Sequence, residues 1–343
     1  MTQPLLLKGT PGSPYTRKML AILRYRHIPY SLLLLDSPRL KALPTAKVEL
    51  LPTFYLPNAQ GVLEAVTDST PLLRRLENDY LTARVQPADL VLRFIDSVLE
   101  DYADEWLTKA MFHYRWHFPD DIAKSGSILP RWRNLTATDH VAAEVGAQFS
   151  QRQIGRLHFV GSNEKTWSVI EQSYKRFLDL FEAHLKTYPF LMGERPGASD
   201  FGVYGQLTQL AHFDPTPAAI ALQNAPRVYA WVSMMEDLSG LVPQEDHWFT
   251  RDALPASLLA ILAEAGRTYV PLMLANAQAL KSGAEKVRAE IDGQPWEQNV
   301  FPYQGKCLRW LRDEFASLSP QDRAEANAIL KKASCLDLVH KSV

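Results

Sequence analysis

The chain has 343 residues, of which 46% are hydrophobic and 22% are charged. This length favours about two domains, and the high apolar content excludes a predominantly disordered chain. Lys and Arg number 37 against 38 Asp and Glu, so the net charge of -1 gives no electrostatic reason to expect a nucleic-acid or anionic-membrane partner.

Cysteine content and hydropathy indicate a cellular compartment. Cys307 and Cys335 are too few for a disulfide framework, so a reducing environment is expected. No apolar run reaches the roughly 18 residues that a membrane span needs. The first residues lack the basic start and cleavage site of a signal peptide. Together these features predict a cytoplasmic protein without a membrane partner.

The first eighty residues alternate between predicted strands and helices. Residues 4–7 are an apolar run that ends in a Gly- and Pro-rich turn, which is typical of a buried strand. Ser13-Pro14 is expected to begin a helix, because serine is a favoured N-cap and proline is favoured at the first helical position. A second apolar run, residues 31–35, follows this helix. Two strands joined by a helix predict parallel pairing.

The next segments complete an α/β unit. Residues 36–49 are expected to form a loop that holds a short irregular helix. Residues 51–56 and 62–67 are predicted to pair as a hairpin, and a helix follows Asp68-Ser69-Thr70-Pro71. The predicted order is therefore β-α-β-α-β-β-α.

From about Pro87 onward the pattern is helical, with almost no strand signal. Apolar residues recur at helical spacing in several segments. Residues 292–302 are rich in Gly, Pro and aromatic residues, and this composition predicts a loop. The expected helices include residues 90–99, 167–187, 201–211, 226–235, 254–282, 304–317 and 322–332.

Ser13 is the first candidate functional residue, at a strand-to-helix turn. In one interpretation it is only an N-cap. In the other, the helix N-terminus binds an anion through unpaired N–H groups, the helix dipole and a hydroxyl donor. A thiolate is such an anion, and the same environment lowers the pKa of a thiol.

Two further turns carry alternatives of the same kind. Leu51-Pro52-Thr53 is either a proline at a strand edge or a cis peptide bond that exposes the backbone of Leu51 for pairing with an extended peptide. Asp68-Ser69 is either an ordinary helix start or a site for an amino-acid head group. In that site the Ser69 hydroxyl would bind a carboxylate and Asp68 an ammonium.

His113 and His117 have the i, i+4 spacing that places two metal ligands on one helix face. No third ligand in a matching motif is evident. A packed helix end, or an aromatic and basic face beside a pocket, explains the segment better, so no metal is expected.

In order and spacing, these turns resemble the glutathione-binding domain of the cytosolic glutathione S-transferases, which has a thioredoxin-like fold. Gly12 to Lys18 is similar to the first turn and helix of that family, His27 to Tyr30 to the entry of its second strand, Leu51-Pro52-Thr53 to its cis-proline, and Thr67 to Glu77 to its γ-glutamyl-binding turn. Residues 189–201 resemble the loop and capping box of the family's helical domain, with Gly197 where the family usually has Ser or Thr.

The resemblance implies a thioredoxin-like domain over residues 1–80 and an all-α domain over residues 87–245. Residues 246–343 go beyond the two domains of the family and are expected to form a helical extension packed on the second domain. This extension is expected either to cover the electrophile pocket or to provide a surface for a partner. The resemblance also implies a homodimer.

The implied activity is attack by the glutathione thiolate on a small hydrophobic electrophile; a non-catalytic binding or interaction protein is the alternative. Because the first domain lacks cysteine, a mixed disulfide with glutathione is not expected there. Ser13 is the expected donor to the sulfur, and Tyr15, expected to face the core, is the reserve. The residues implied for glutathione binding are Leu51, Pro52, Asp68, Ser69 and Lys47, and Arg39 and Lys41 are further candidates to bind its glycine carboxylate. The residues implied for the electrophile pocket between the domains are His113, Arg115 and Trp116.

Overall fold

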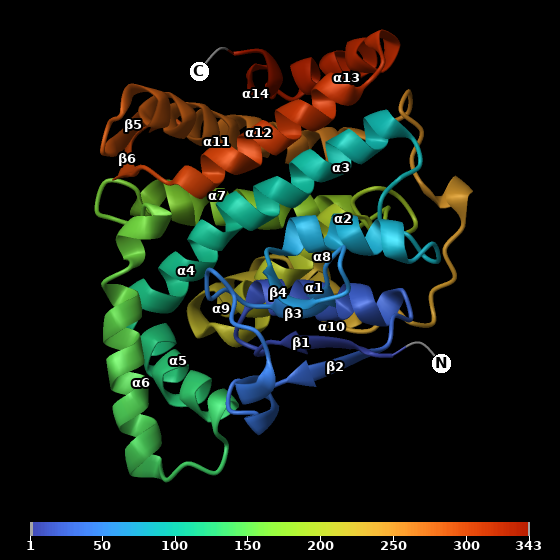
Figure 1. Ribbon diagram of the computed structural model, residues 1–343. Coiled ribbons are helices and arrows are strands. Elements are labelled where there is room, and N and C mark those ends of the chain that lie inside the picture. Colours follow the sequence, from blue (N-terminus) through green and yellow to red (C-terminus); the bar gives the residue numbers. More distant parts are fainter. Residues whose placement is uncertain (1–2, 342–343) are drawn as a thin grey trace.

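The computed structural model describes residues 3–341, and its N-terminal part is a four-stranded mixed sheet (Figure 1). The strands lie in the order β2-β1-β3-β4, with β1 parallel to β2 and the other pairs antiparallel. The predicted order and pairings are confirmed. The elements are β1 (Leu5–Lys8), α1 (Pro14–Tyr25), β2 (Tyr30–Leu33), η1 (Pro38–Ala42), β3 (Thr53–Pro57), β4 (Leu63–Thr67) and α2 (Ser69–Asp79).

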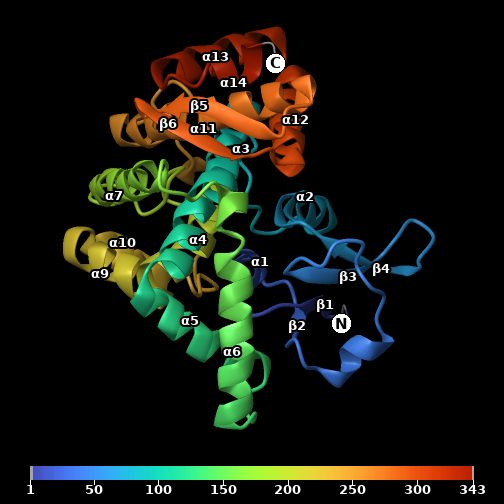
Figure 2. The ribbon, with the colours of Figure 1, turned by 90° about the vertical axis from the view of Figure 1, so that its left-hand side faces the viewer.

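The two faces of this sheet have different surroundings. Leu7 of β1 lies opposite Phe54 of β3, and both are fully buried with α1 and α2 in the main core. Lys8 pairs with Thr53 and points to the other face, because side chains alternate along a strand. In Figure 2, α2 and the short helix η1 lie on opposite sides of the sheet. Thr53 and Tyr55 on the second face border a cavity that the η1 segment and helical residues farther along the chain also line.

A long helical part follows the sheet, as predicted. The pattern did not predict α5, α6 or α9, whose burial is confined to a few residues each. The elements are α3 (Leu90–Tyr102), η2 (Ala103–Leu107), α4 (Thr108–His117), α5 (Pro119–Arg133), α6 (Asp139–Ile154), η3 (Leu157–Val160), α7 (Trp167–His184), α8 (Ala198–Leu207), η4 (Thr208–Phe213), α9 (Pro215–Asn224), α10 (Pro226–Met234) and η5 (Glu245–His247).

The start of α8 shows how Gly197 replaces the usual Ser or Thr. Asp200 accepts the Gly197 N–H at 2.8 Å and the Leu191 N–H at 2.9 Å. Asp96 of α3 accepts the N–H groups of Ala198 and Ser199 at 3.1 and 3.0 Å. A Cβ atom at position 197 would lie 2.5 Å from Asp96 Oδ1. Glycine is therefore required here, because a carboxylate from a neighbouring helix does the capping.

The remaining residues form a helical layer with one hairpin. Residues 292–302 were predicted as a loop, and this prediction is wrong. Asp292 and Gly293 both have positive φ and join β5 to β6 in a tight turn, for which the Asp-Gly pair is the sequence signal. The elements are α11 (Ala256–Ser282), β5 (Lys286–Ile291), β6 (Gln294–Asn299), α12 (Pro302–Ser317), α13 (Pro320–Lys332) and α14 (Asp337–His340).

Helix α11 is long and apolar enough to cross a membrane by length and composition alone, although no unbroken apolar run of that length occurs in it. Within the described chain, however, 61% of its most apolar window is buried. It packs against α7, α12 and β5, and its Leu258, Leu262 and Tyr269 have no exposed surface. The apolar face of α11 is thus part of the protein core. In Figure 1 the layer formed by α11 to α14 lies above α3 and α7.

Candidate functional site

The N-terminus of α1 meets the turn before β3. Ser13 is the N-cap of α1, where its Oγ accepts the Thr16 N–H at 3.2 Å and donates to the Leu51 carbonyl at 3.3 Å. The Leu51-Pro52 peptide bond is cis, as the turn suggested. An extended peptide that pairs with the Leu51 backbone would therefore place its side chain within reach of the Ser13 hydroxyl.

Arg115 holds the loop that leads to Ser13. Its guanidinium binds both oxygens of the buried Asp214 carboxylate at 2.9 to 3.1 Å, and its Nη1 donates to the Gly12 carbonyl at 3.2 Å. Gln209 adds a bond to the Pro11 carbonyl at 3.1 Å. Arg115 therefore has a positioning role for this loop and does not line any of the described cavities.

His113 and Trp116 also lie outside the described cavities. His113 is fully buried, with Nδ1 at 2.9 Å from Ser162 Oγ and Nε2 at 3.4 Å from Glu171. Trp116 is buried against Phe112 and Phe149. The expectation that His113, Arg115 and Trp116 form the pocket wall is thus corrected, because packing and ion pairing use all three side chains. No cluster of three or more His, Cys, Asp or Glu suited to a metal ion occurs among residues 3–341.

A cavity of about 270 Å³ lies beside Leu51 on the side of α2 and α12. Tyr15 lines it and is not directed into the core as expected. Its hydroxyl donates to the Asp104 carbonyl at 2.9 Å and lies 3.4 Å from Thr108 Oγ1. Burial, with the charges of Asp104 and Glu105, raises the pKa of Tyr15 well above its ordinary value. We call this space the acidic cavity, after four of its lining residues: Asp68, Asp101, Asp104 and Glu105.

Asp68 and Ser69 lie together at the wall of the acidic cavity, at the start of α2. Asp68 has φ of 84°, a backbone conformation that favours glycine and that is retained where surrounding structure enforces it, often at binding sites. Helix α12 reaches the same carboxylate: Tyr303 lies beside Asp68 in the cavity wall, and Lys306 Nζ lies 4.0 Å from the Asp68 carboxylate. The extension therefore covers the position expected for an amino-acid head group.

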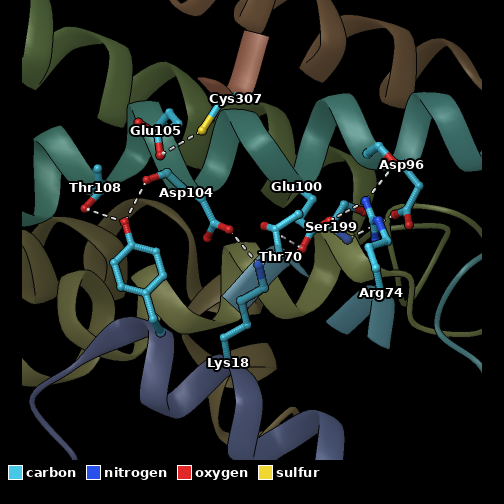
Figure 3. Close-up of polar contacts among 12 residues, drawn as sticks. Lys18, Thr70, Arg74, Asp96, Glu100, Asp104, Glu105, Thr108, Ser199 and Cys307 are labelled. Atoms are coloured by element: carbon cyan, nitrogen blue, oxygen red, sulfur yellow. Dashed lines mark hydrogen bonds and ion pairs between the residues drawn. The ribbon is translucent and has the colours of Figure 1, made fainter. Parts of the chain in front are cut away.

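A buried ionic network supports this wall from below (Figure 3). Lys18 of α1 is fully buried and donates to Glu100 at 2.7 Å and to Asp104 at 2.6 Å. Arg74 of α2 also binds Glu100, at 3.0 Å. Burial alone would lower the pKa of Lys18, but the charges of Asp104 and Glu100 raise it above the ordinary value. The network thus joins α1 and α2 to the helical part beneath the acidic cavity.

The other carboxyl groups near this cavity have raised pKa values. Burial raises the pKa of Asp101 to about 7, although a hydrogen bond from Tyr269 opposes the shift. Burial likewise raises the pKa of Asp104 to about 6. The pKa of Glu105 is raised by burial and by the charge of Asp101. These acids therefore keep their protons to a higher pH than exposed carboxyl groups do, and at pH 5 the neutral forms of Asp101 and Asp104 are favoured.

Asp101→Asn is expected to change how stability depends on pH. A folded-state pKa of about 7 exceeds the ordinary value near 4, so the stabilisation from the protonated carboxyl is complete below about pH 4 and is lost as pH rises through 7. Asparagine stays neutral and can still accept from Tyr269. The difference in unfolding free energy between the variant and wild type should therefore shift in favour of the variant by on the order of 2 kcal/mol from pH 5 to pH 8.

Urea unfolding at both pH values measures this change. Asp313→Asn, an exposed residue of α12, is the control. If the unfolding free energies of the Asp101 variant and of wild type change equally from pH 5 to pH 8, Asp101 does not titrate in this range.

A second cavity, of about 550 Å³, lies on the other side of Leu51, between the η1 segment and α6. We call it the basic cavity, because Lys8, Arg133, Arg152 and Arg156 line it. Lys47, expected to bind a carboxylate, is exposed and is not among its lining residues, although Thr45, Ala46 and Glu49 are. The role assigned to Lys47 stays a prediction.

Two models of known protein domains match this sequence. The glutathione S-transferase N-terminal domain matches residues 7–83, and the glutathione S-transferase C-terminal domain matches residues 139–233. The chain belongs to the glutathione S-transferase family. These two matches cover about half of the chain and leave out residues 84–138 and the layer from α11 to α14.

Solved structures of glutathione S-transferases resemble this chain only distantly. A GST-like protein from Pseudomonas syringae is 18% identical over 68% of this chain and 67% of its own, with a TM-score of 0.42. A Tau class enzyme from mango, Mangifera indica, is 17% identical over 71% and 94%, with a TM-score of 0.42. A family member from Pseudomonas fluorescens, described with two glutathione bound, is 14% identical over 67% and 87%, with a TM-score of 0.40. A search among proteins with curated descriptions found no significant match.

The site of this family member includes residues that the sequence pattern did not indicate. Tyr303 and Lys306 reach Asp68 from more than 230 residues away, and only the fold brings them together. Arg133 and Arg152 of the basic cavity lie on α5 and α6, whose helical pattern is weak, and Arg156 follows the end of α6. Asp104 was visible only as part of an acidic stretch, Asp101 to Glu105.

Proposed function

We propose that this protein binds glutathione and stabilises its thiolate for attack on an electrophile. The observation that carries the proposal is the Ser13 hydroxyl, which lies 3.3 Å from the Leu51 carbonyl at the N-terminus of α1. Backbone pairing with Leu51 would bring the cysteine of glutathione to this helix end. There a hydroxyl donor and the helix dipole both favour the anionic form of sulfur.

The γ-glutamyl group of glutathione would lie at Asp68 and Ser69. The Ser69 hydroxyl and the first N–H groups of α2 suit its carboxylate, and the Asp68 carboxylate suits its ammonium. The Tyr303 hydroxyl and the Lys306 ammonium, which already contact Asp68, would then border the head group. The glycine end would extend past Leu50 toward the basic cavity, near Lys47.

The reaction needs no nucleophile from the protein. The thiolate attacks the electrophilic carbon, and the leaving group departs with its electron pair. Ser13 donates to the sulfur in the thiolate form, so it lowers the thiol pKa and raises the fraction of nucleophile at neutral pH. The protein is proposed to act in the cytoplasm, as a homodimer of the kind the resemblance implies.

One observation favours a second candidate, a binding protein without catalysis. Helix α12 lies over Asp68 and narrows the space above the head-group position. A protein whose extension restricts the site in this way could bind glutathione without activating it. The two candidates differ in the pKa of the bound thiol, which only the enzyme needs to lower.

Calorimetric titration with glutathione tests the shared binding step. Ser69→Ala is expected to weaken binding about tenfold, since it removes a hydrogen bond to a charged carboxylate. Ser233→Ala, on the exposed face of α10, is the control and should bind as wild type does. Equal affinity of the Ser69 variant and wild type would exclude this placement of the head group.

A further inference from the structure

The basic cavity carries more positive charge than its surroundings neutralise. Lys8, Arg133, Arg152 and Arg156 line it, and Glu49 is the one acidic residue among its lining residues. Within residues 3–341 none of the four cations forms an ion pair; Arg156 has only a long bond to the Gln153 amide, at 3.4 Å. An unneutralised cationic cavity of about 550 Å³ attracts anions.

This cavity adjoins the proposed sulfur position. Leu50 and Leu51 line it, and the Leu51 carbonyl accepts the Ser13 hydroxyl. Near the end of α5, Leu129 and Trp132 pack so closely on Gly12 that a Cβ atom there would lie 2.6 Å from Leu129 Cδ2. Arg133 follows Trp132 directly. An electrophile in the basic cavity would therefore lie beside the thiolate.

The walls also offer apolar surface for an aromatic or aliphatic body. Phe149 of α6, Tyr55 of β3 and Leu50 line the cavity together with the arginines. Arginine presents a planar set of donors that matches a carboxylate or phosphate in two-bond geometry. Figure 2 shows α6, which carries Arg152, running alongside the N-terminal sheet.

We propose that the basic cavity binds an electrophile that carries an anionic group, such as an aromatic carboxylate. This inference rests on the proposed transferase function and changes the expected substrate class from hydrophobic to anionic. The glycine carboxylate of glutathione carries a single negative charge, whereas four cations line the cavity. The remaining cations are left for the second substrate.

A matched pair of electrophiles tests the proposal in the full-length protein. In 4-chloro-3,5-dinitrobenzoate the thiolate attacks the carbon that bears chlorine, a C–S bond forms, and chloride leaves with the bonding pair. The benzamide of the same ring reacts identically but is neutral. Arg152→Gln and Arg156→Gln should each raise KM for the benzoate about fivefold and leave KM for the benzamide unchanged.

Arg131→Gln is the control, because Arg131 pairs with Asp139 and does not line the cavity. A high salt concentration should raise KM for the benzoate alone. Equal effects of the arginine variants on both electrophiles would overturn the proposal. So would a rise in KM for glutathione without a change for the benzoate, which would assign these arginines to the glycine carboxylate.

A binding measurement separates this inference from the transferase function. The compound 3,5-dinitrobenzoate lacks the leaving group, so calorimetric titration with it needs neither glutathione nor turnover. Weaker binding in both arginine variants, with normal binding in Arg131→Gln, would support the anion site even if no conjugation occurred. Unchanged binding in the arginine variants would overturn the proposal whether or not the protein conjugates glutathione.

Discussion

Ser13→Ala is expected to lower kcat for glutathione conjugation about 100-fold, the loss typical when one preorganised donor to a reacting anion is removed. The Ser13 Oγ lies at the N-terminus of α1, at 3.3 Å from the Leu51 carbonyl. The Tyr15 hydroxyl is already bonded to the Asp104 carbonyl at 2.9 Å, so it is not free to replace Ser13. Steady-state kinetics with saturating glutathione measures the loss.

Two further variants separate the donor from the helix cap. Ser13 also caps α1 through the Thr16 N–H, and loss of a cap costs about 1 kcal/mol of stability. Ser13→Asp keeps a cap but has no donor, so it should be as inactive as the alanine variant. Ser13→Thr keeps both and should recover much of the rate. An active aspartate variant would show that Ser13 acts only as a cap.

Lys18→Met is expected to destabilise the folded protein by about 3 to 5 kcal/mol, as removal of one partner from a buried ion pair does. Lys18 is the cation between the buried carboxylates of Glu100 and Asp104 (Figure 3). Without it, only Arg74 remains near Glu100, and Asp104 loses its one ion-pair partner in the described chain. Urea unfolding gives the free energy.

The control is Lys332→Met at an exposed position of α13, which should leave the unfolding free energy within about 0.5 kcal/mol of wild type. Adding Glu100→Gln and Asp104→Asn to the Lys18 variant should restore part of the lost stability, because the buried charges are then gone. A Lys18 variant as stable as wild type would show that this network is not a buried ionic core.

Local patterns predicted the N-terminal part of the fold well. Ser13-Pro14, the apolar runs and the hairpin each carry their signal within a few residues, and the structure confirms them. The Gly and Pro content of residues 292–302 predicts a loop, but this prediction is wrong because Asp292-Gly293 forms the turn of a hairpin whose Trp296 is buried. The sequence pattern does not predict helices α5 and α6, because few of their residues are buried and their apolar periodicity is therefore weak.

The candidate site was predictable only where it consists of backbone turns. Ser13, Leu51 and Asp68 lie at turns with their own sequence signatures, and the fold brings Ser13 and Leu51 together. Arg115 and His113 were misplaced because a basic or aromatic side chain looks the same in sequence whether it lines a cavity or pairs with a buried acid such as Asp214. The contacts of Tyr303 and Lys306 depend on how α12 packs, which no local pattern encodes.

Ultraviolet titration of the thiol of bound glutathione tests the central claim most directly. The protein should lower the pKa of that thiol by at least about one unit from its free value near 8.5. In Ser13→Ala with glutathione still bound, the pKa should return close to the free value. A bound thiol that titrates as free glutathione does in the wild-type protein would contradict thiolate stabilisation and favour a binding protein without catalysis.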